Sequence, residues 1–407
     1  MIMDVYYDKL SEHCEVFSGY AFKSQDLLTE GDIPVVKIGN ISNGRDLILD
    51  KDTQYVDKIF LSINEKYHIK KGDVLISLTG SHINQPNSMV GRSCRYYKNQ
   101  ELLLNQRAGK ILAKTNNDLS FLYYMFSSWA MKVSITNRAY GAANQANVSP
   151  SDILSIKFNF PNYECQKKIG LILSRYDEAI ENNNKRIKLL EQMAQNLYKE
   201  WFVRFRFPGY ENCEFENGIP VGWSCKNLFD IVNVTYGYAF TSELFCDDES
   251  LNPVVRIRDI LDNNTKTFTS EECSDKYIIK ENEILIGMDG IFHMCMWNGG
   301  KAYQNQRVVK LTTKTEEYSN YFLFFAVQPQ IKFWEQTIAG TTVAHLGDKH
   351  LKRINVLIPS DDILKQATIK FNLLMKQKNS LFKANKNLAK QRDLLLPRLM
   401  SGKLEVE

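Results

Sequence analysis

The fold is decided by a stretch that the chain contains twice, as GYAFKS at residues 19–24 and as GYAFTS at residues 237–242. Five more segments of the first half return, in the same order, in the second half. These pairs are PVVKIGNI at 34–41 with PVVRIRDI at 253–260, KKGDVLISLTG at 70–80 with KENEILIGMDG at 280–290, NQRAGKI at 105–111 with NQRVVKL at 305–311, YGAANQANVSPSDI at 140–153 with AGTTVAHLGDKHL at 339–351, and IKFNFP at 156–161 with INVLIP at 354–359. Because chance does not readily produce six collinear matches, we interpret the chain as two copies of one domain.

Each copy has the sequence pattern of an α+β domain that is mainly β. Short apolar runs rich in Val, Ile, Tyr and Thr alternate with turns that contain Gly, Asn and Asp, which is typical of strands. One helix is expected within each copy, near 118–134 in the first and near 317–334 in the second. We therefore place two similar domains at 1–161 and 209–359.

A long segment poor in Gly and Pro follows each copy, at 162–208 and at 360–407. Within each segment, apolar residues recur at alternating spacings of three and four, which indicates a long helix over about 164–203 and another over about 361–396. Pro397 is predicted to end the second helix. An isolated surface helix is the alternative interpretation, which the length of these segments disfavours.

The apolar stripe along each predicted helix marks a surface on which the two helices pack together. Neither helix has enough apolar surface to be stable alone in water, so we expect each to cover the other. Three polar residues, Lys378, Asn385 and Arg392, fall on the stripe, and polar seam positions can fix the register of paired helices. The predicted apolar seam consists of Ile169, Ile172, Tyr176, Ile180, Ile187, Leu190 and Leu197 in the first helix and of Phe371, Leu374, Leu381, Leu388 and Leu395 in the second.

The charge and the apolar runs of the chain limit its function only broadly. A formal net charge of +4 permits a nucleic-acid partner without establishing one, because phosphate binding depends on local clusters of cations. The N-terminal residues lack the basic-then-apolar order of a signal peptide, and the longest apolar run, Phe322 to Val327, is too short to cross a membrane. These features predict a cytoplasmic protein without a membrane partner.

Sequence motifs of catalysis are missing. The chain contains no phosphate-binding G-x-x-x-x-G-K-[ST] loop, no G-x-G-x-x-G, and no Asn or Asp followed by Pro-Pro and an aromatic, the signature of adenine methyltransferases. No lysine has Asp or Glu two positions before it, as many metal-dependent nucleases do, and neither C-x-x-C nor H-E-x-x-H occurs. We therefore predict no catalytic residue and no metal ligand in this chain.

Two copies without catalytic motifs suggest two recognition domains rather than an enzyme. Arg can bond guanine, Asn and Gln can bond adenine, and Lys, Ser and backbone amides can hold phosphates. NQR occurs at the same place in both copies, which favours a shared turn, whereas residues that differ between the copies are better candidates for specificity. The candidate DNA-binding residues are Lys23, Ser24, Arg92, Arg95, Asn105, Gln106, Arg107, Asn144 and Gln145 in the first copy and Thr241, Ser242, Arg256, Arg258, Asn305, Gln306, Arg307 and His345 in the second.

Over essentially its whole length, the chain resembles the specificity subunits of type I restriction-modification systems. Besides the paired GYAF-x-S segments and KKGDVLIS-x-TG, the resemblance depends on four stretches. They are ENGIPVGW at 216–223, ECQKKIGLILSRYDEAIENNNKRIKLLEQM at 164–193, LYKEWFVRF at 197–205 and LLLPRLMSGKL at 394–404. In one respect the chain departs from the family pattern, because its first domain lacks the G-I-P-x-G-W opener seen at 218–223 and begins near Tyr7 to Leu10.

The resemblance implies a function that the residues alone do not give. Each target-recognition domain would read one half of a bipartite, asymmetric site in double-stranded DNA. The two helices would pack antiparallel, set the length of the unread spacer and dock two methyltransferase subunits, and restriction subunits with translocase activity would join the full complex. These partners would use S-adenosylmethionine, ATP and Mg²⁺, and this chain would bind none of these three cofactors. A fused methyltransferase or nuclease and a protein-binding scaffold are the alternatives.

Overall fold

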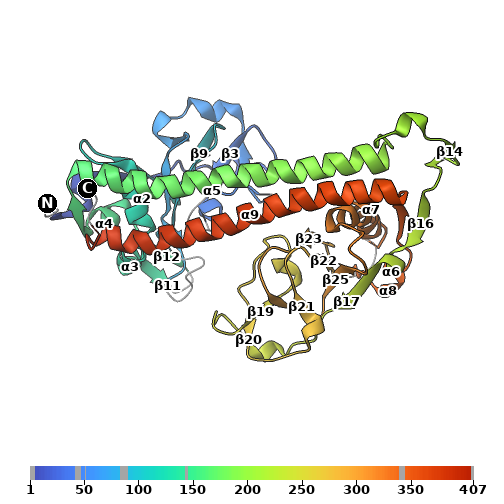
Figure 1. Ribbon diagram of the computed structural model, residues 1–407. Coiled ribbons are helices and arrows are strands. Elements are labelled where there is room, and N and C mark those ends of the chain that lie inside the picture. The colour runs from blue at the N-terminus through green and yellow to red at the C-terminus, as the bar shows by residue number, and fades with distance from the viewer. Residues whose placement is uncertain are drawn as a thin grey trace. The chain divides into compact units, whose positions relative to one another are not determined.

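A computed structural model of the 407-residue chain describes residues 5–41, 47–50, 52–82, 90–142, 145–338 and 344–404. The chain divides into two compact units, and each contains one copy of the repeat with part of both long helices (Figure 1). The first unit consists of residues 1–180 and 387–407, and the second of residues 181–386. Both units mix short strands with helices, which confirms the predicted α+β class.

The centre of the first unit is formed by two four-stranded sheets. In spatial order, the first sheet contains β2 (Cys14–Ser18), β10 (Ala108–Ala113), β6 (Val74–Ser77) and β8 (Ser93–Arg95). The second sheet contains, in the same way, β4 (Gln54–Val56), β3 (Ile33–Val36), β9 (Leu102–Leu104) and β5 (His68–Ile69). All neighbours are antiparallel except β3 and β9. β3, β6 and β9 are buried throughout, because their largely apolar runs of three or four residues suit strands covered on both faces.

The remaining elements of the first unit surround these sheets. They are β1 (Val5–Lys9) paired with β13 (Lys157–Pro161), α1 (Leu10–His13), α4 (Pro150–Leu154), and a small sheet of β11 (Tyr140–Ala142), β12 (Gln145–Asn147) and β7 (Thr79–Gly80). The helix predicted near 118–134 is two helices, α2 (Leu119–Ser127) and α3 (Trp129–Thr136), so the prediction of one helix was wrong. The break has a local cause, because the Ser128 hydroxyl accepts a hydrogen bond from the Met131 amide at 3.3 Å and caps α3.

The second unit repeats this arrangement. Its first sheet contains β17 (Val232–Tyr236), β25 (Val308–Thr313), β22 (Ile284–Gly287) and β23 (Met294–Met296), and its second β18 (Phe245–Cys246), β20 (Phe268–Thr269), β19 (Asn252–Val255), β24 (Ala302–Gln304) and β21 (Ile278–Ile279). β19 and β24 are parallel, as β3 and β9 are in the first unit. Also present are β14 (Phe215–Glu216) with β15 (Ile219–Pro220), β16 (Ser224–Asn227) with β26 (Asn355–Ile358), α6 (Leu228–Ile231), α7 (Asn320–Ile338) and α8 (Asp348–Leu351).

The two copies begin in corresponding ways. In the first, β1 pairs with β13 and leads into α1, and in the second β16 pairs with β26 and leads into α6. Among the described residues the first copy opens with β1, and the G-I-P-x-G-W opener adds the β14–β15 hairpin in front of the second. The helix expected at 317–334 is the continuous α7, which carries Pro329 within it.

A buried ion pair occupies the same place inside both copies. Lys110 on β10 has its Nζ 2.5 Å from a carboxylate oxygen of Asp73, and Lys310 on β25 has its Nζ 3.4 Å from a carboxylate oxygen of Glu283. The ammonium groups also donate to backbone carbonyls, of His68 at 3.1 Å and of Ile278 at 2.6 Å. All four charged side chains are largely buried, and such charges are tolerated only when they are paired and hydrogen-bonded.

The long helices are α5 (Tyr163–Tyr198), which continues through a π-helical turn at Lys199–Val203, and α9 (Asp361–Met400), drawn in green and red in Figure 1. The prediction that Pro397 ends the second helix was wrong, because α9 continues to Met400. Leu399 and Met400 are buried in the core of the first unit, and this burial offsets the hydrogen bond that a proline cannot donate.

Burial along the two helices can be compared with the predicted seam residue by residue. Its members are buried or half-buried except Ile172, which is exposed, and Leu173 is buried instead in the core of the first unit. An α-helix has 3.6 residues per turn, so the inward-facing position after Ile169 falls four residues later rather than three.

Polar residues of the seam are paired across the two helices within each unit. In the first unit, Arg392 of α9 forms an ion pair with Asp177 of α5, and the hydroxyl of Tyr124 donates to the same carboxylate at 2.5 Å. In the second unit, the Asn183 Nδ2 donates to Oδ1 of Asn385 at 2.8 Å. Residues late in α9 therefore face residues early in α5, which makes the helices antiparallel in both units.

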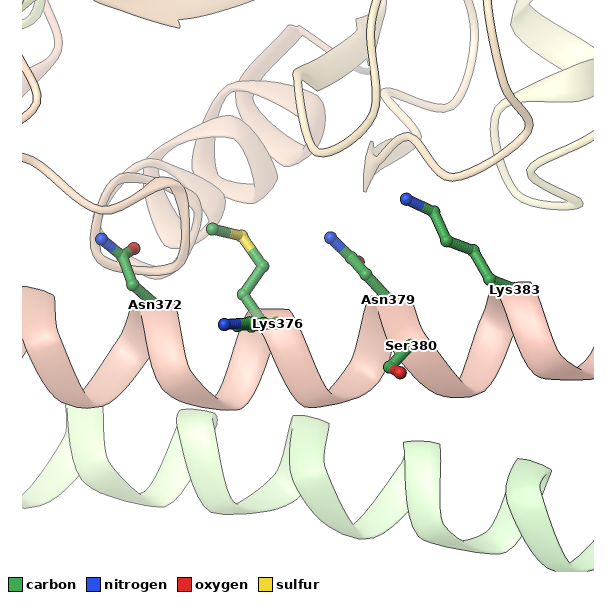
Figure 2. Close-up of a pocket in the computed structure, with 6 residues that line it drawn as sticks. Asn372, Lys376, Asn379, Ser380 and Lys383 are labelled. Atoms are coloured by element: carbon green, nitrogen blue, oxygen red, sulfur yellow. The ribbon is translucent and has the colours of Figure 1, made fainter.

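Lys378 is the third polar seam residue and the most deeply buried. Its Nζ lies 3.7 Å from a carboxylate oxygen of Glu191 and 5.1 Å from the ring centre of Tyr321, and burial lowers the pKa of its ammonium group. On the side of α9 away from α5, a pocket of about 380 Å³ is lined by Asn372, Met375, Lys376, Asn379, Ser380 and Lys383 (Figure 2).

Candidate nucleic-acid interface

Three segments that are distant in sequence meet around the NQR turn of the first copy. The amide of Leu78 donates to the carbonyl of Arg107 at 3.0 Å, and the amide of Val148 donates to the carbonyl of Leu78 at 3.0 Å. The second copy has the same frame: the amide of Met288 donates to the carbonyl of Arg307 at 3.0 Å, and that of Leu346 donates to Met288 at 2.7 Å. We call this surface the NQR face. Its residues are 78–80, 105–107 and 145–148 in the first copy and 288–290, 305–307 and 344–346 in the second.

The asparagine of NQR has a different role from its neighbours. Asn105 and Asn305 are buried. The backbone amide of Asn105 donates to the carbonyl of Val36 on β3 at 3.0 Å, and that of Asn305 donates to the carbonyl of Val255 on β19 at 3.1 Å. The Oδ1 of Asn105 also accepts a bond from the amide of Arg107 at 3.3 Å. The asparagines therefore shape the turn, as the repeated motif suggested. The side chains of the glutamine and the arginine of each turn are exposed to solvent: Gln106, Arg107, Gln306 and Arg307.

GYAF lies against the NQR turn in both copies, which explains its glycine. A Cβ at Gly19 would overlap the carbonyl oxygen of Leu104, and one at Gly237 would overlap that of Asn305. The close approach lets the amide of Tyr20 donate to the carbonyl of Leu104 at 2.7 Å. Only glycine permits such contact between two backbones.

The NQR face of the first copy carries adjacent positive charges. Burial, followed by the nearby charge of Arg107, lowers the pKa of the Lys37 ammonium group, which donates to the amide oxygen of Gln54. Lys37 was missed in the sequence, although it occupies the same place in PVVKIGNI as Arg256 does in PVVRIRDI. Beside the turn, the Thr79 hydroxyl donates to Oδ1 of Asn147 at 2.9 Å across two paired strands.

The second copy has an aspartate and a histidine where the first has Thr79 and Asn147. Asp289 and His345 face each other across an isolated antiparallel bridge, whereas Thr79 and Asn147 face each other between the paired strands β7 and β12. The Nδ1 of His345 lies 2.6 Å from Oδ1 of Asp289, and the Nε of Arg307 lies 3.4 Å from Oδ2 of the same carboxylate. Asp289 was not among the predicted site residues, because its partners are distant in sequence.

Of the other candidates, three arginines are engaged within the fold. Arg95 donates to the carbonyl of Gly72 at 3.3 Å and to the hydroxyl of Ser120 at 3.1 Å. Arg256 donates to the hydroxyl of Thr267 and lies over the ring of Phe245. Arg92 is half-buried, and this burial lowers the pKa of its guanidinium. These arginines are better placed to support the domains than to read bases.

The remaining candidates lie on the surface of their own copies, apart from Asn144, which is outside the described residues. They are Lys23, Ser24 and Gln145 in the first copy and Thr241, Ser242 and Arg258 in the second. A repeated aromatic pair was missed: Tyr67 lies 5.6 Å from Tyr20, and Tyr277 lies 5.4 Å from Tyr238, between ring centres. The recurrence of Lys-Tyr at 66–67 and 276–277 was the available signal.

The described ranges contain neither a metal-binding cluster nor a membrane-spanning helix. Within them, no three His, Cys, Asp or Glu residues are grouped so as to hold a metal ion. Of the helices that the structure describes, none is long and apolar enough to cross a membrane.

Comparison with known families gives the two copies a common identity. The model of the type I restriction modification DNA specificity domain matches the chain twice, at residues 4–192 and 220–389. The chain belongs to this family. Each match contains one copy of the repeat and most of the long helix that follows it, so the type I specificity subunit suggested by the sequence motifs is confirmed.

Individual relatives are consistent with the family match. The type I restriction enzyme MjaIX specificity subunit of Methanocaldococcus jannaschii is 27% identical over 328 residues, which cover 75% of this chain and 74% of the relative. The EcoBI specificity subunit of Escherichia coli is 28% identical over 191 residues, 46% of this chain and 40% of the relative. The crystal structure of a type I S subunit from M. genitalium shares the fold, with a TM-score of 0.55 at 15% identity, covering 98% of this chain and 96% of that one.

Family membership decides between the function classes left open by the sequence. Type I specificity subunits are the DNA-recognition components of their systems and are not catalysts. Such subunits act in complexes with modification and restriction subunits. Because the family is not catalytic, the chain is a recognition subunit rather than a fused methyltransferase or nuclease.

Proposed function

We propose that each copy reads one half of a bipartite, asymmetric DNA site through its NQR face. The supporting observation is that both faces share one backbone frame but carry different side chains beside the exposed arginine, Thr79 and Asn147 in one and Asp289 and His345 in the other. Arg and Gln on an exposed turn offer the donors and acceptors that distinguish bases in the major groove. Two faces that differ at these positions would read different half-sites.

The recognition domains of this proposal are residues 1–161 and 209–359. Cations and hydroxyl groups on these domains would hold the phosphates of the DNA. They are Lys23, Ser24, Lys37 and Arg107 in the first copy and Thr241, Ser242 and Arg258 in the second. The chain would carry out this function in the cytoplasm.

The helices α5 and α9 would set the spacer and dock the methyltransferase subunits. Paired polar residues along the seam give the two helices one register. A fixed register is needed if the helices are to hold the two domains at a constant distance. Within the second unit, four large apolar side chains stay exposed on the helices: Leu189 and Met193 on α5 and Ile369 and Leu373 on α9. Each pair is four residues apart and so lies on one helix face. Leu189 and Met193 also line part of a groove of about 400 Å³. Exposed apolar patches of this kind mark protein interfaces.

A pulldown with a methyltransferase partner tests the docking surface. Met193→Glu and Leu373→Glu should each weaken capture of the partner without lowering the melting temperature, because both side chains are exposed. Lys188→Glu, an exposed change on α5 that removes no apolar group, is the control for added charge. Unchanged capture by both variants would move the docking surface elsewhere.

The chemistry of the complex would belong to the partners. Two methyltransferase subunits would use S-adenosylmethionine, and restriction subunits would use ATP and Mg²⁺ for translocation and cleavage. The direct test of the function is sequencing of methylated adenines in cells with and without this gene. Loss of one bipartite motif on deletion is expected. Methyl transfer from S-adenosylmethionine by the rigorously purified chain alone would contradict the assignment.

A further inference from the structure

We propose that Arg307 reads a guanine in the half-site of the second domain and that Asp289 and His345 position it. This inference rests on the proposed function, and it names the residues and the base that the second NQR face would use. The first face lacks this arrangement, because no ion pair of Arg107 occurs among the described residues and its neighbours are Thr79 and Lys37.

The geometry places the carboxylate beneath the guanidinium. The side chain of Asp289 is 28% exposed, against 54% for Arg307 and 45% for His345, so the two donors stand further into solvent than the group that holds them. One carboxylate oxygen meets Nδ1 of His345 at 2.6 Å, and the other meets Nε of Arg307 at 3.4 Å. Asp289 therefore links both side chains into one cluster.

The backbone beneath this cluster is fixed on both sides of Asp289. The amide of Gly290 donates to the carbonyl of Ala344 at 3.0 Å, and the amide of Leu346 donates to the carbonyl of Met288 at 2.7 Å. Met288 and Leu346 are buried in the core of the second unit. A recognition group supported by a rigid element and a bonded neighbour keeps its orientation before the ligand arrives.

The chemistry of the cluster favours a base edge over a phosphate. Since the ion-pair contact with Asp289 is made at Nε, the two Nη groups of Arg307 are available to donate in parallel, which matches the O6 and N7 acceptors of guanine. A carboxylate next to the arginine also repels phosphate, whereas the neutral Thr79 and the cation Lys37 beside Arg107 do not. The two faces would thus use the same arginine differently, for a base in the second copy and for the backbone in the first.

The test uses the full chain in complex with its methyltransferase subunits. Methylation rates are measured on duplexes carrying each of the four bases at every position of both half-sites, and exchange of 209–359 identifies the half-site of the second domain. Asp289→Asn and Arg307→Lys should each reduce discrimination for guanine at one position of that half-site by about tenfold or more. Arg107→Lys is the matched control, and it should slow methylation of all duplexes by a similar factor without changing any base preference.

The outcomes separate this inference from the proposed function. A second half-site without guanine on either strand, unchanged discrimination in Asp289→Asn, or a uniform loss on all duplexes would overturn the guanine-reading role. Gln306→Ala, on the same exposed turn, should keep the guanine preference and so shows that the turn still folds. If the wild-type complex methylates no bipartite site, or if exchange of 209–359 changes neither half, the proposed function itself fails.

Discussion

The interiors of the two copies are alike, whereas their NQR faces differ. Lys110 with Asp73 and Lys310 with Glu283 form the same buried ion pair, and a single exchange of Asp for Glu separates them. A few residues away, the neutral pair of the first face is replaced in the second by Asp289, His345 and Arg307. This contrast is what we expect of one scaffold that is kept for stability and one surface that changes with the proposed DNA half-site.

Changing the length of α5 and α9 tests whether these helices set the distance between the two copies. Four residues inserted after Ile180 in α5 and four after Lys386 in α9 lengthen both helices by about 6 Å and keep the polar pairs of each unit intact. The preferred spacer should grow by one or two base pairs, at about 3.4 Å each, with both half-sites unchanged. Methylome sequencing gives the spacer directly.

The control for that experiment is an insertion of two residues at the same places. Two residues rotate the helix face by about 200°, so the seam is disrupted and the complex should lose activity and stability rather than acquire a new spacer. An unchanged spacer in an active four-residue variant would show that these helices do not set the spacer length.

Breaking the buried ion pair tests whether the interiors are equivalent. Lys310→Met leaves Glu283 buried without its partner, and Lys110→Met does the same to Asp73, so each should destabilise its own unit by about 3–5 kcal/mol. Denaturant unfolding measures the effect. The double variant Lys310→Met with Glu283→Leu should recover much of the loss, and a single variant without effect would mean that the pair does not hold this part of the core.

The glycine of GYAF offers a smaller test of the same scaffold. Gly19→Ala and Gly237→Ala each place a Cβ against a backbone carbonyl and should cost about 1–3 kcal/mol of stability. Gly39→Ala, where a Cβ would meet open space, is the matched control. Equal unfolding midpoints for Gly19→Ala and Gly39→Ala would rule out the close backbone approach.

The smallest expected difference between the copies is a pH dependence. Asp259 occupies the place of Asn40, and burial raises the pKa of its carboxyl from 3.8 to about 6. Since the folded form holds its proton more tightly than the unfolded chain, the stability of the second copy should decrease as pH rises from about 4 to about 6. Asp259→Asn should remove this dependence in thermal unfolding, and a dependence that persists in the variant would place its origin in another group.

The sequence predicted the repeat, the α+β class and both long helices, because these depend on periodic patterns that span many residues. It did not place Ile172 correctly, since the choice between Ile172 and Leu173 depends on which residue the domain core receives. The buried Lys110 and Lys310 were not recognised, because a lysine in a strand is ordinarily assumed to face solvent. Asp289 and His345 are 56 residues apart, and only the strand pairing brings them together.

Exchange of residues 209–359 for the second domain of another family member tests whether two independent recognition domains share one chain. The methylated adenine motif of cells carrying the exchanged chain is sequenced beside that of the parent chain. We predict that one half-site changes to that of the donor while the other half-site and the spacer stay the same. A motif in which both half-sites change, or neither does, in a folded and active complex would contradict the independence of the two domains.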